Sequence, residues 1–188
     1  MKKACLDLRV SSIEKQNEKY FLLKLTHQLP LPQMVPGQFV EVRVDHSPTT
    51  FLRRPISINN YVAEANELWL LVARVGDGTR QLGTLSEGDV VNCLLPLGNG
   101  FTVPTRPDSR VLLVGGGVGV APLLYFGKKI REAGARPTFL LGARTQADLL
   151  QLELFEELGD VHVTTEDGSY GEKGFVTNQS VLERVRFD

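Results

Sequence analysis

Residues 111–122, VLLVGGGVGVAP, set the architecture of the second half of the chain. Four aliphatic residues in a row are typical of a strand that is buried on both faces of a parallel sheet. The glycines that follow permit a tight turn, and Pro122 suits the first turn of a helix, because its missing N–H is not needed there. The stretch therefore predicts a strand, a glycine-rich turn and a helix in succession.

The alternation of strand and helix continues toward the C-terminus. We expect strands at residues 111–114, 137–142 and 161–165 and helices at residues 121–133, 146–158 and 176–185. Such alternation predicts a parallel, doubly wound sheet. We assign this α/β domain to residues 106–188, and we expect its sheet to end after three strands with an open edge.

Residues 1–105 have a different pattern, in which short runs rich in β-branched, aromatic and aliphatic residues alternate with turn signals. The runs that predict strands are residues 20–26, 38–44, 68–74 and 90–95, and a short helix is expected at residues 79–85. Several short strands at this spacing indicate a small barrel or sandwich.

The composition excludes several classes of protein. The chain has 188 residues with 21 Lys and Arg against 22 Asp and Glu, so its net charge of −1 gives no general attraction to nucleic acid or anionic lipid. No uncharged stretch is apolar enough for a membrane span, and the N-terminus lacks the apolar core of a signal peptide. Cys5 and Cys93 offer no disulfide framework and no metal site, so we expect a cytoplasmic, reduced protein.

The glycine-rich turn is the strongest candidate for a ligand site. Glycines allow the backbone to approach a ligand closely, and the start of the helix presents free N–H groups and a positive dipole to a phosphate. The alternative is a tight turn without a ligand, although four glycines exceed what a turn requires. The spacing is not the usual G-x-G-x-x-G, and Arg144 replaces the expected acidic residue after the second strand. Arg144 could contact a phosphate or ribose, or it could be a solvated loop charge.

Two further motifs are compatible with phosphate binding. Pro55 favours an extended backbone at Arg54, whose planar guanidinium can bind a pyrophosphate through two parallel hydrogen bonds. In Gly76-Asp77-Gly78-Thr79, backbone N–H groups and the Thr79 hydroxyl could bind another phosphate oxygen. Each motif also has an ordinary interpretation, namely solvated arginines on an edge strand and a plain turn.

No side chains are arranged for catalysis without a cofactor. His27, His46 and His162 are scattered, with no carboxylate or cysteine at ligand spacing. There is no Ser-His-Asp order and no paired carboxylate motif. The chemistry of such a chain must come largely from a cofactor.

Taken in this order and spacing, the motifs resemble the ferredoxin–NADP reductase superfamily. Within it they look most like the electron-transfer subunit of the NAD-dependent class of dihydroorotate dehydrogenase. The resemblance implies an FAD-binding, six-stranded antiparallel β-barrel at residues 1–105, followed by a parallel-sheet NAD(P)H-binding domain at residues 106–188. The motifs that carry it are Arg54-Pro55-Ile56-Ser57, Gly76-Asp77-Gly78-Thr79, Pro96-Leu97-Gly98-Asn99-Gly100-Phe101, Gly115-Gly116-Gly117-Val118-Gly119-Val120-Ala121-Pro122 and Asp167-Gly168-Ser169-Tyr170-Gly171-Glu172-Lys173-Gly174.

The resemblance also implies roles for single residues. Arg54 would bind the flavin pyrophosphate, and Ser57 would lie near the reactive edge of the isoalloxazine as the one candidate catalytic residue. The remaining flavin contacts would come from Pro55, Ile56, Val72, Ala73, Arg74, Gly78 and Thr79. The nicotinamide nucleotide would face Gly115, Gly116, Gly117, Gly119, Ala121 and Pro122.

The chain departs from the family pattern in two places. Leu95 stands where family members usually have a glycine before the P-L-G-x-G-F loop. The family also continues past this chain's last residue, Asp188, to a cysteine cluster for a [2Fe-2S] centre, and Cys5 and Cys93 match none of those ligands. We therefore expect a shortened nucleotide-binding domain, weak or absent NAD(P)H turnover by this chain alone, and a cluster only in a longer chain.

The predicted function is that of a flavoprotein electron-transfer subunit. It would pass electrons between NAD(P)H and FAD for dihydroorotate oxidation in pyrimidine biosynthesis, in a hetero-oligomer with a catalytic dihydroorotate dehydrogenase subunit. Another superfamily reductase is an alternative, such as a flavin reductase or a subunit of a sulfide dehydrogenase, glutamate synthase or hydrogenase. A second alternative is a non-catalytic FAD-binding docking module, and a third is a scaffold without any ligand.

Overall fold

The computed structural model describes residues 3–188, which form two compact units. The N-terminal unit ends at Phe101, and the C-terminal unit runs from Thr102 to Asp188. No helix among these described residues is long and apolar enough to cross a membrane.

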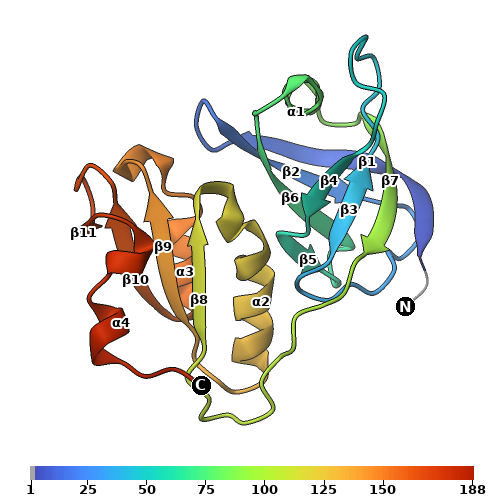
Figure 1. Cartoon of the computed structure of the whole chain (residues 1–188). Coiled ribbons are helices and arrows are strands. Elements are labelled where there is room, and N and C mark those ends of the chain that lie inside the picture. The colour runs from blue at the N-terminus through green and yellow to red at the C-terminus, as the bar shows by residue number, and fades with distance from the viewer. Residues whose placement is uncertain (1–2) are drawn as a thin grey trace. The chain divides into compact units, whose positions relative to one another are not determined.

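The N-terminal unit is built on one antiparallel sheet of seven strands with the order β4-β3-β7-β1-β2-β6-β5 (Figure 1). The strands are β1 (Ala4–Lys15), β2 (Tyr20–Thr26), β3 (Phe39–Val42), β4 (Arg54–Ser57), β5 (Asn60–Val62), β6 (Glu67–Ala73) and β7 (Val90–Leu97).

The sheet curls into a half-barrel. Strands β4 and β5 stand at opposite ends of the strand order, although only Ile58 and Asn59 separate them in the sequence. The Ile58 N–H donates to the Gln38 carbonyl (3.0 Å), and the Asn59 N–H donates to the Trp69 carbonyl (2.9 Å). The two edges of the sheet therefore meet at this link, and the apolar face turns inward.

Alternation along the strands places the core of this unit. In β3, Val40 and Val42 are fully buried, whereas Phe39 and Glu41 on the other face are partly exposed. The antiparallel barrel fold is confirmed, with seven strands rather than the expected six. The sequence also gave no signal for β1, because only Leu8 and Val10 of its twelve residues are fully buried.

The short helix α1 (Asp77–Leu82) begins and ends earlier than residues 79–85, where it was expected. Gly76 precedes its first turn in an extended conformation, and Gly83 follows its last turn. Leu82 is the buried contact of the helix with the barrel.

The C-terminal unit contains a parallel sheet with the order β11-β10-β9-β8. Its strands are β8 (Leu112–Gly116), β9 (Thr138–Ala143), β10 (Asp160–Thr165) and β11 (Glu172–Lys173). The expectation that the sheet ends after three strands was wrong, because β11 adds a short fourth strand beside Thr164 and Thr165. Strand β8 forms the other edge of the sheet among the described residues.

Helical segments cover both faces of this sheet, as expected for a doubly wound domain. On one face, Gly127 of α2 (Ala121–Glu132) packs so closely on Phe139 that a Cβ there would lie 2.4 Å from the ring. Phe155 of α3 (Leu152–Leu158) packs on the same ring, with centroids 4.9 Å apart. On the other face, Val176 covers Gly142.

Two of the expected helices are interrupted. Residues 146–158 form a 3₁₀ turn (Gln146–Asp148) and then α3, because Gln151 adopts a left-handed conformation with φ 54° between them. Residues 176–185 likewise form a 3₁₀ turn (Val176–Asn178) followed by the short helix α4 (Val181–Arg184). Single continuous helices at these places were therefore wrong.

Candidate functional site

Arg54 and Gly78 come from separate motifs and meet in the structure. Arg54 is the first residue of β4, and its side chain passes directly over Gly78 in the first turn of α1. A Cβ on Gly78 would lie 2.8 Å from Arg54 Cδ and 2.9 Å from Thr50 Cγ2. Glycine is therefore required at position 78 for the arginine to lie against the start of the helix.

The Thr79 hydroxyl holds the turn together. It accepts the N–H groups of Val75 and Gly76, each at 3.1 Å, and donates to the Gly76 carbonyl at 3.1 Å. The sequence interpretation gave this hydroxyl to a phosphate, but its proton is already engaged within the loop. The donors that remain for an anion are the first N–H groups of α1, which have no partner within the helix.

The charges around this turn leave Arg54 available. The Asp77 carboxylate accepts a hydrogen bond from Arg80 (2.9 Å) and one from the Thr49 hydroxyl (3.1 Å), and these bonds hold the pKa of Asp77 below its ordinary value. Asp77 thus stays ionised, with Arg80 as its partner. Within residues 3–188, no carboxylate forms an ion pair with Arg54.

The rest of β4 lies at the partly exposed surface of the barrel. Pro55 is exposed, and Ile56 and Ser57 are half-buried. Ser57 stands opposite Phe39 in the register of β3 and β4. These residues are accessible to a ligand that is bound at Arg54.

At the end of β6, two of the predicted flavin contacts, Val72 and Arg74, have structural roles in the barrel. The Val72 side chain is 1% exposed and belongs to the core, so only its backbone could line a ligand. The Arg74 guanidinium lies 4.7 Å from the centre of the Phe21 ring and donates to the Gly83 carbonyl at 3.5 Å. Arg74 therefore ties the end of α1 to β2, with Ala73 beside it in the strand.

In the C-terminal unit the glycine motif spans the end of β8 and a 3₁₀ turn (Gly117–Val120) before α2. Folding accounts for two of its glycines. A Cβ on Gly115 would lie 2.8 Å from Leu123 Cδ1 and 3.1 Å from Val120 Cα. Gly117 has φ 52°, in the left-handed region that favours glycine.

Folding does not account for the other two glycines. A Cβ on Gly116 would make only an ordinary contact of 3.6 Å with the Gly142 carbonyl. A Cβ on Gly119 would meet nothing within 4 Å, and its φ is not in the left-handed region. The open space at Gly119, two residues before Ala121, leaves the backbone accessible to a bound group.

Sequence reasoning missed one feature at the same ends of the strands. Gly116, Gly142 and Thr164 stand side by side across β8, β9 and β10. The Thr164 hydroxyl is buried and has no hydrogen-bond partner among the described residues. Such orphaned groups are rare in folded proteins, and a threonine in a β-rich run gives no sequence signal of one.

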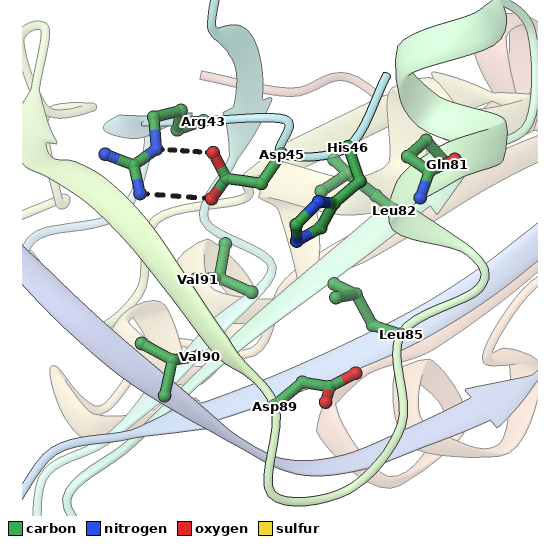
Figure 2. A pocket seen from close by; sticks show the side chains of 9 residues that line it. All are labelled: Arg43, Asp45, His46, Gln81, Leu82, Leu85, Asp89, Val90 and Val91. Atoms are coloured by element: carbon green, nitrogen blue, oxygen red, sulfur yellow. Dashed lines mark hydrogen bonds and ion pairs between the residues drawn. The ribbon is translucent and has the colours of Figure 1, made fainter. Parts of the chain in front are cut away.

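The sequence-predicted residues lie outside two cavities of this chain. One, of about 240 Å³, lies in the N-terminal unit beside the ion pair of Arg43 and Asp45 (Figure 2). The other, of about 570 Å³, lies at the amino ends of β9 and β10. No group of three or more His, Cys, Asp or Glu side chains in the described part of the chain is placed to hold a metal ion.

The chain has relatives among known proteins. No family model matches the chain. The dihydroorotate dehydrogenase B (NAD(+)) electron transfer subunit of Shouchella clausii (strain KSM-K16) is 42% identical over 180 residues, which are 95% of this chain and 69% of that protein. The subunit of the same name from Lysinibacillus sphaericus (strain C3-41) is 41% identical over 182 residues, which are 96% of this chain and 70% of that protein.

Solved structures agree with these relatives. The structure of an NADH-dependent reduced ferredoxin-NADP oxidoreductase, studied for flavin-based electron bifurcation, has a TM-score of 0.82 and 32% identity. The match covers 93% of this chain and 62% of that chain. The half-barrel and the parallel sheet therefore have the fold of a ferredoxin–NADP reductase-like oxidoreductase.

Within that class, the chain belongs to the family of dihydroorotate dehydrogenase B (NAD(+)) electron transfer subunits. The resemblance seen in the sequence is thus confirmed. The chain spans 69% and 70% of the two relatives and 62% of the oxidoreductase chain.

Proposed function

We propose that this chain binds FAD in its N-terminal unit and NAD(P)H in its C-terminal unit, and passes electrons between them. One observation supports the flavin site above all others. Arg54, which forms no ion pair with a described carboxylate, lies against the start of α1, over Gly78, where a Cβ would collide with the arginine side chain.

The residues present fit the pyrophosphate of FAD. The Arg54 guanidinium offers a planar fork of donors, and the first N–H groups of α1 at Gly78 and Thr79 add neutral donors beside it. Pairing with Arg80 limits the repulsion that Asp77 would exert on a phosphate. Pro55, Ile56 and Ser57 would then follow the flavin along β4, with Ser57 as the candidate residue near its reactive edge.

The glycine motif fits the nicotinamide nucleotide. The fold leaves room for a side chain at Gly116 and at Gly119. Glycine at these two positions instead keeps the backbone accessible to a nucleotide. The twelve-residue helix α2 begins at Ala121 and Pro122, so the positive end of its dipole faces the same place. The name of the relatives contains NAD(+), which favours NADH over NADPH as the donor.

The cofactor supplies the redox chemistry. FAD, when bound, would supply hydride acceptance from the nicotinamide and single-electron release. The residues of this chain bind and orient the two nucleotides through their phosphates. No side chain of the chain needs to exchange a proton with the substrate in this role.

The family name supports a specific partner. The relatives are called electron transfer subunits of dihydroorotate dehydrogenase B, so we assign this chain to a hetero-oligomer with a catalytic dihydroorotate dehydrogenase subunit in pyrimidine biosynthesis. Two free cysteines without a disulfide suit the reducing cytoplasm, where we place the protein. A [2Fe-2S] cluster belongs to a longer chain in this proposal.

Anaerobic mixing of the FAD-loaded chain with NADH tests the function. We expect NADH to bleach the flavin absorbance. If the chain retains FAD but its absorbance does not change, the result would instead support a non-catalytic docking module. A chain that does not bind FAD at all would refute the flavin site itself. Size-exclusion chromatography of the chain mixed with a catalytic dihydroorotate dehydrogenase subunit then tests the partner, because the two chains should elute together.

A further inference from the structure

We infer that Arg53 is a positioning residue, which fixes the start of β4 so that Arg54 faces the pyrophosphate of FAD. This inference rests on the proposed flavin site. It separates the roles of two adjacent arginines that look equivalent in the sequence.

The Arg53 side chain is hydrogen-bonded to two neighbouring strands of the barrel. Its Nη1 donates to the Asn92 carbonyl at 3.0 Å and to the Glu41 carbonyl at 3.3 Å, and its Nη2 donates to Asn92 Oδ1 at 2.5 Å. The guanidinium is half-buried. Because these donors are already hydrogen-bonded, Arg53 is less suited than Arg54 to bind a phosphate.

These bonds form a polar brace across four neighbouring strands. Arg53 precedes β4 directly, Glu41 lies in β3 and Asn92 lies in β7. Asn92 Nδ2 in turn donates to Asp7 Oδ1 in β1 at 2.6 Å. The brace thus follows the sheet order β4-β3-β7-β1.

Strand β4 needs such support because it is short and stands at an edge. It has four residues and forms one end of the strand order. Pro55 stands opposite Glu41 in the pairing with β3. A short edge strand frays readily, and fraying would move Arg54 away from Gly78.

The two arginines divide these tasks because of strand geometry. Successive side chains point to opposite faces of a strand, so Arg53 and Arg54 cannot share one face. Arg53 lies with Asn92 and Asp7, which stand opposite each other in the register of β1 and β7. Arg54 lies on the other side, against α1.

A double-mutant cycle on FAD affinity tests the inference. We compare wild type, Arg53→Met, Arg54→Met and the double variant by titration of the apoprotein with FAD, since methionine keeps the apolar stem and removes the donors. Arg53→Met should weaken FAD binding roughly three- to thirtyfold, the range expected for residues of one network. In the Arg54→Met background, the same change should have almost no further effect.

Two additional variants separate positioning from general destabilisation. Asn92→Ala removes the side-chain acceptor of Arg53 in β7, so it should weaken FAD binding in wild type but not in Arg53→Met. Arg43→Gln is the matched control, because Arg43 lies near the same strands and its guanidinium, among the described residues, binds the side chain of Asp45, at 2.8 and 3.1 Å (Figure 2). It should leave FAD affinity unchanged.

The outcomes are distinguishable. An equal loss of affinity from Arg53→Met in both backgrounds would reduce Arg53 to a stabiliser of the barrel and overturn the inference. Full FAD affinity in Arg53→Met would overturn it as well, while the proposed function would stand. Only a failure of wild type to bind FAD would refute the flavin site and this inference together.

Discussion

At the scale of single residues, the glycines divide into two groups that the sequence alone does not separate. Gly78 and Gly115 are required by side chains that pack within 2.8 Å of their missing Cβ atoms. Gly119 faces open space and has no unusual backbone conformation. A glycine without a structural reason in a strand-to-helix turn is the one to assign to a ligand, and this difference can be tested by substitution.

Arg54→Ala should weaken FAD binding without unfolding the barrel. The change removes charge-assisted hydrogen bonds worth about 1.5–3 kcal/mol, which corresponds to roughly ten- to a hundredfold in affinity. Flavin titration of the apoprotein measures the affinity, and thermal unfolding of the apoprotein is the control. Unchanged affinity would remove Arg54 from the site.

Gly119→Val and Gly115→Val should behave differently. Valine at position 119 has room in the fold but obstructs the approach of a pyrophosphate to the backbone, so NADH-driven flavin reduction should fall while FAD and the melting temperature are retained. Valine at position 115 would collide with Leu123 and Val120 and should unfold the C-terminal unit. Stopped-flow reduction and thermal unfolding of both variants decide this, and a destabilised Gly119→Val would identify a purely structural glycine.

At the scale of elements, the sequence predicted the strands that contain runs of aliphatic residues. The expected strand at residues 20–26 coincides with β2, where Phe21, Leu22, Leu23 and Leu25 are all buried. The short strands β5 and β11 were missed because their two or three residues form no apolar run. They are strands because their backbones pair with β6 and β10. The break before α3 was missed because a left-handed Gln151 has no signature in the sequence.

One contact predicts a pH dependence for the segment after β11. The Glu172 carboxylate accepts hydrogen bonds from the hydroxyl (2.5 Å) and N–H (3.0 Å) of Ser180, which lower the pKa of Glu172 below its ordinary value of 4.5; the charges of Arg184 and His162 act in the same direction. A lowered folded-state pKa means that this stabilisation is present above pH 4.5 and is lost as the pH falls through the folded-state pKa.

Hydrogen exchange of α4, corrected for the intrinsic rate, measures this effect. Protection of Val181–Arg184 should decrease in wild type as the pH falls below 4.5. Glu172→Gln should show weaker protection already at neutral pH and little further change on acidification. The same acid-induced loss in both proteins would assign it to another carboxylate.

At the scale of the whole molecule, family and fold were predictable, but the arrangement of the site was only partly so. The order and spacing of the motifs are properties of the sequence, and they led to the family that the relatives confirm. The contact of Arg54 with Gly78 depends on how the barrel closes, and the engagement of the Thr79 hydroxyl depends on a turn of α1. Neither can be obtained from local patterns.

The cysteines limit how many electrons this chain can hold. A [2Fe-2S] cluster with four thiolate ligands needs more than the two cysteines present. Cys93 is fully buried in β7, and burial raises the pKa of its thiol to about 12, so it remains protonated. We therefore expect neither iron nor acid-labile sulfide in the purified chain, even after anaerobic reconstitution.

Reductive titration checks this expectation independently of the iron assay. With FAD as its only redox group, the chain should take up one pair of electrons and no more. Electron paramagnetic resonance of the dithionite-reduced protein should show no cluster signal. A stoichiometric [2Fe-2S] signal, or uptake of a third electron, would mean that ligands other than cysteine complete a cluster, and the assignment of FAD as the only redox group of this chain would be wrong.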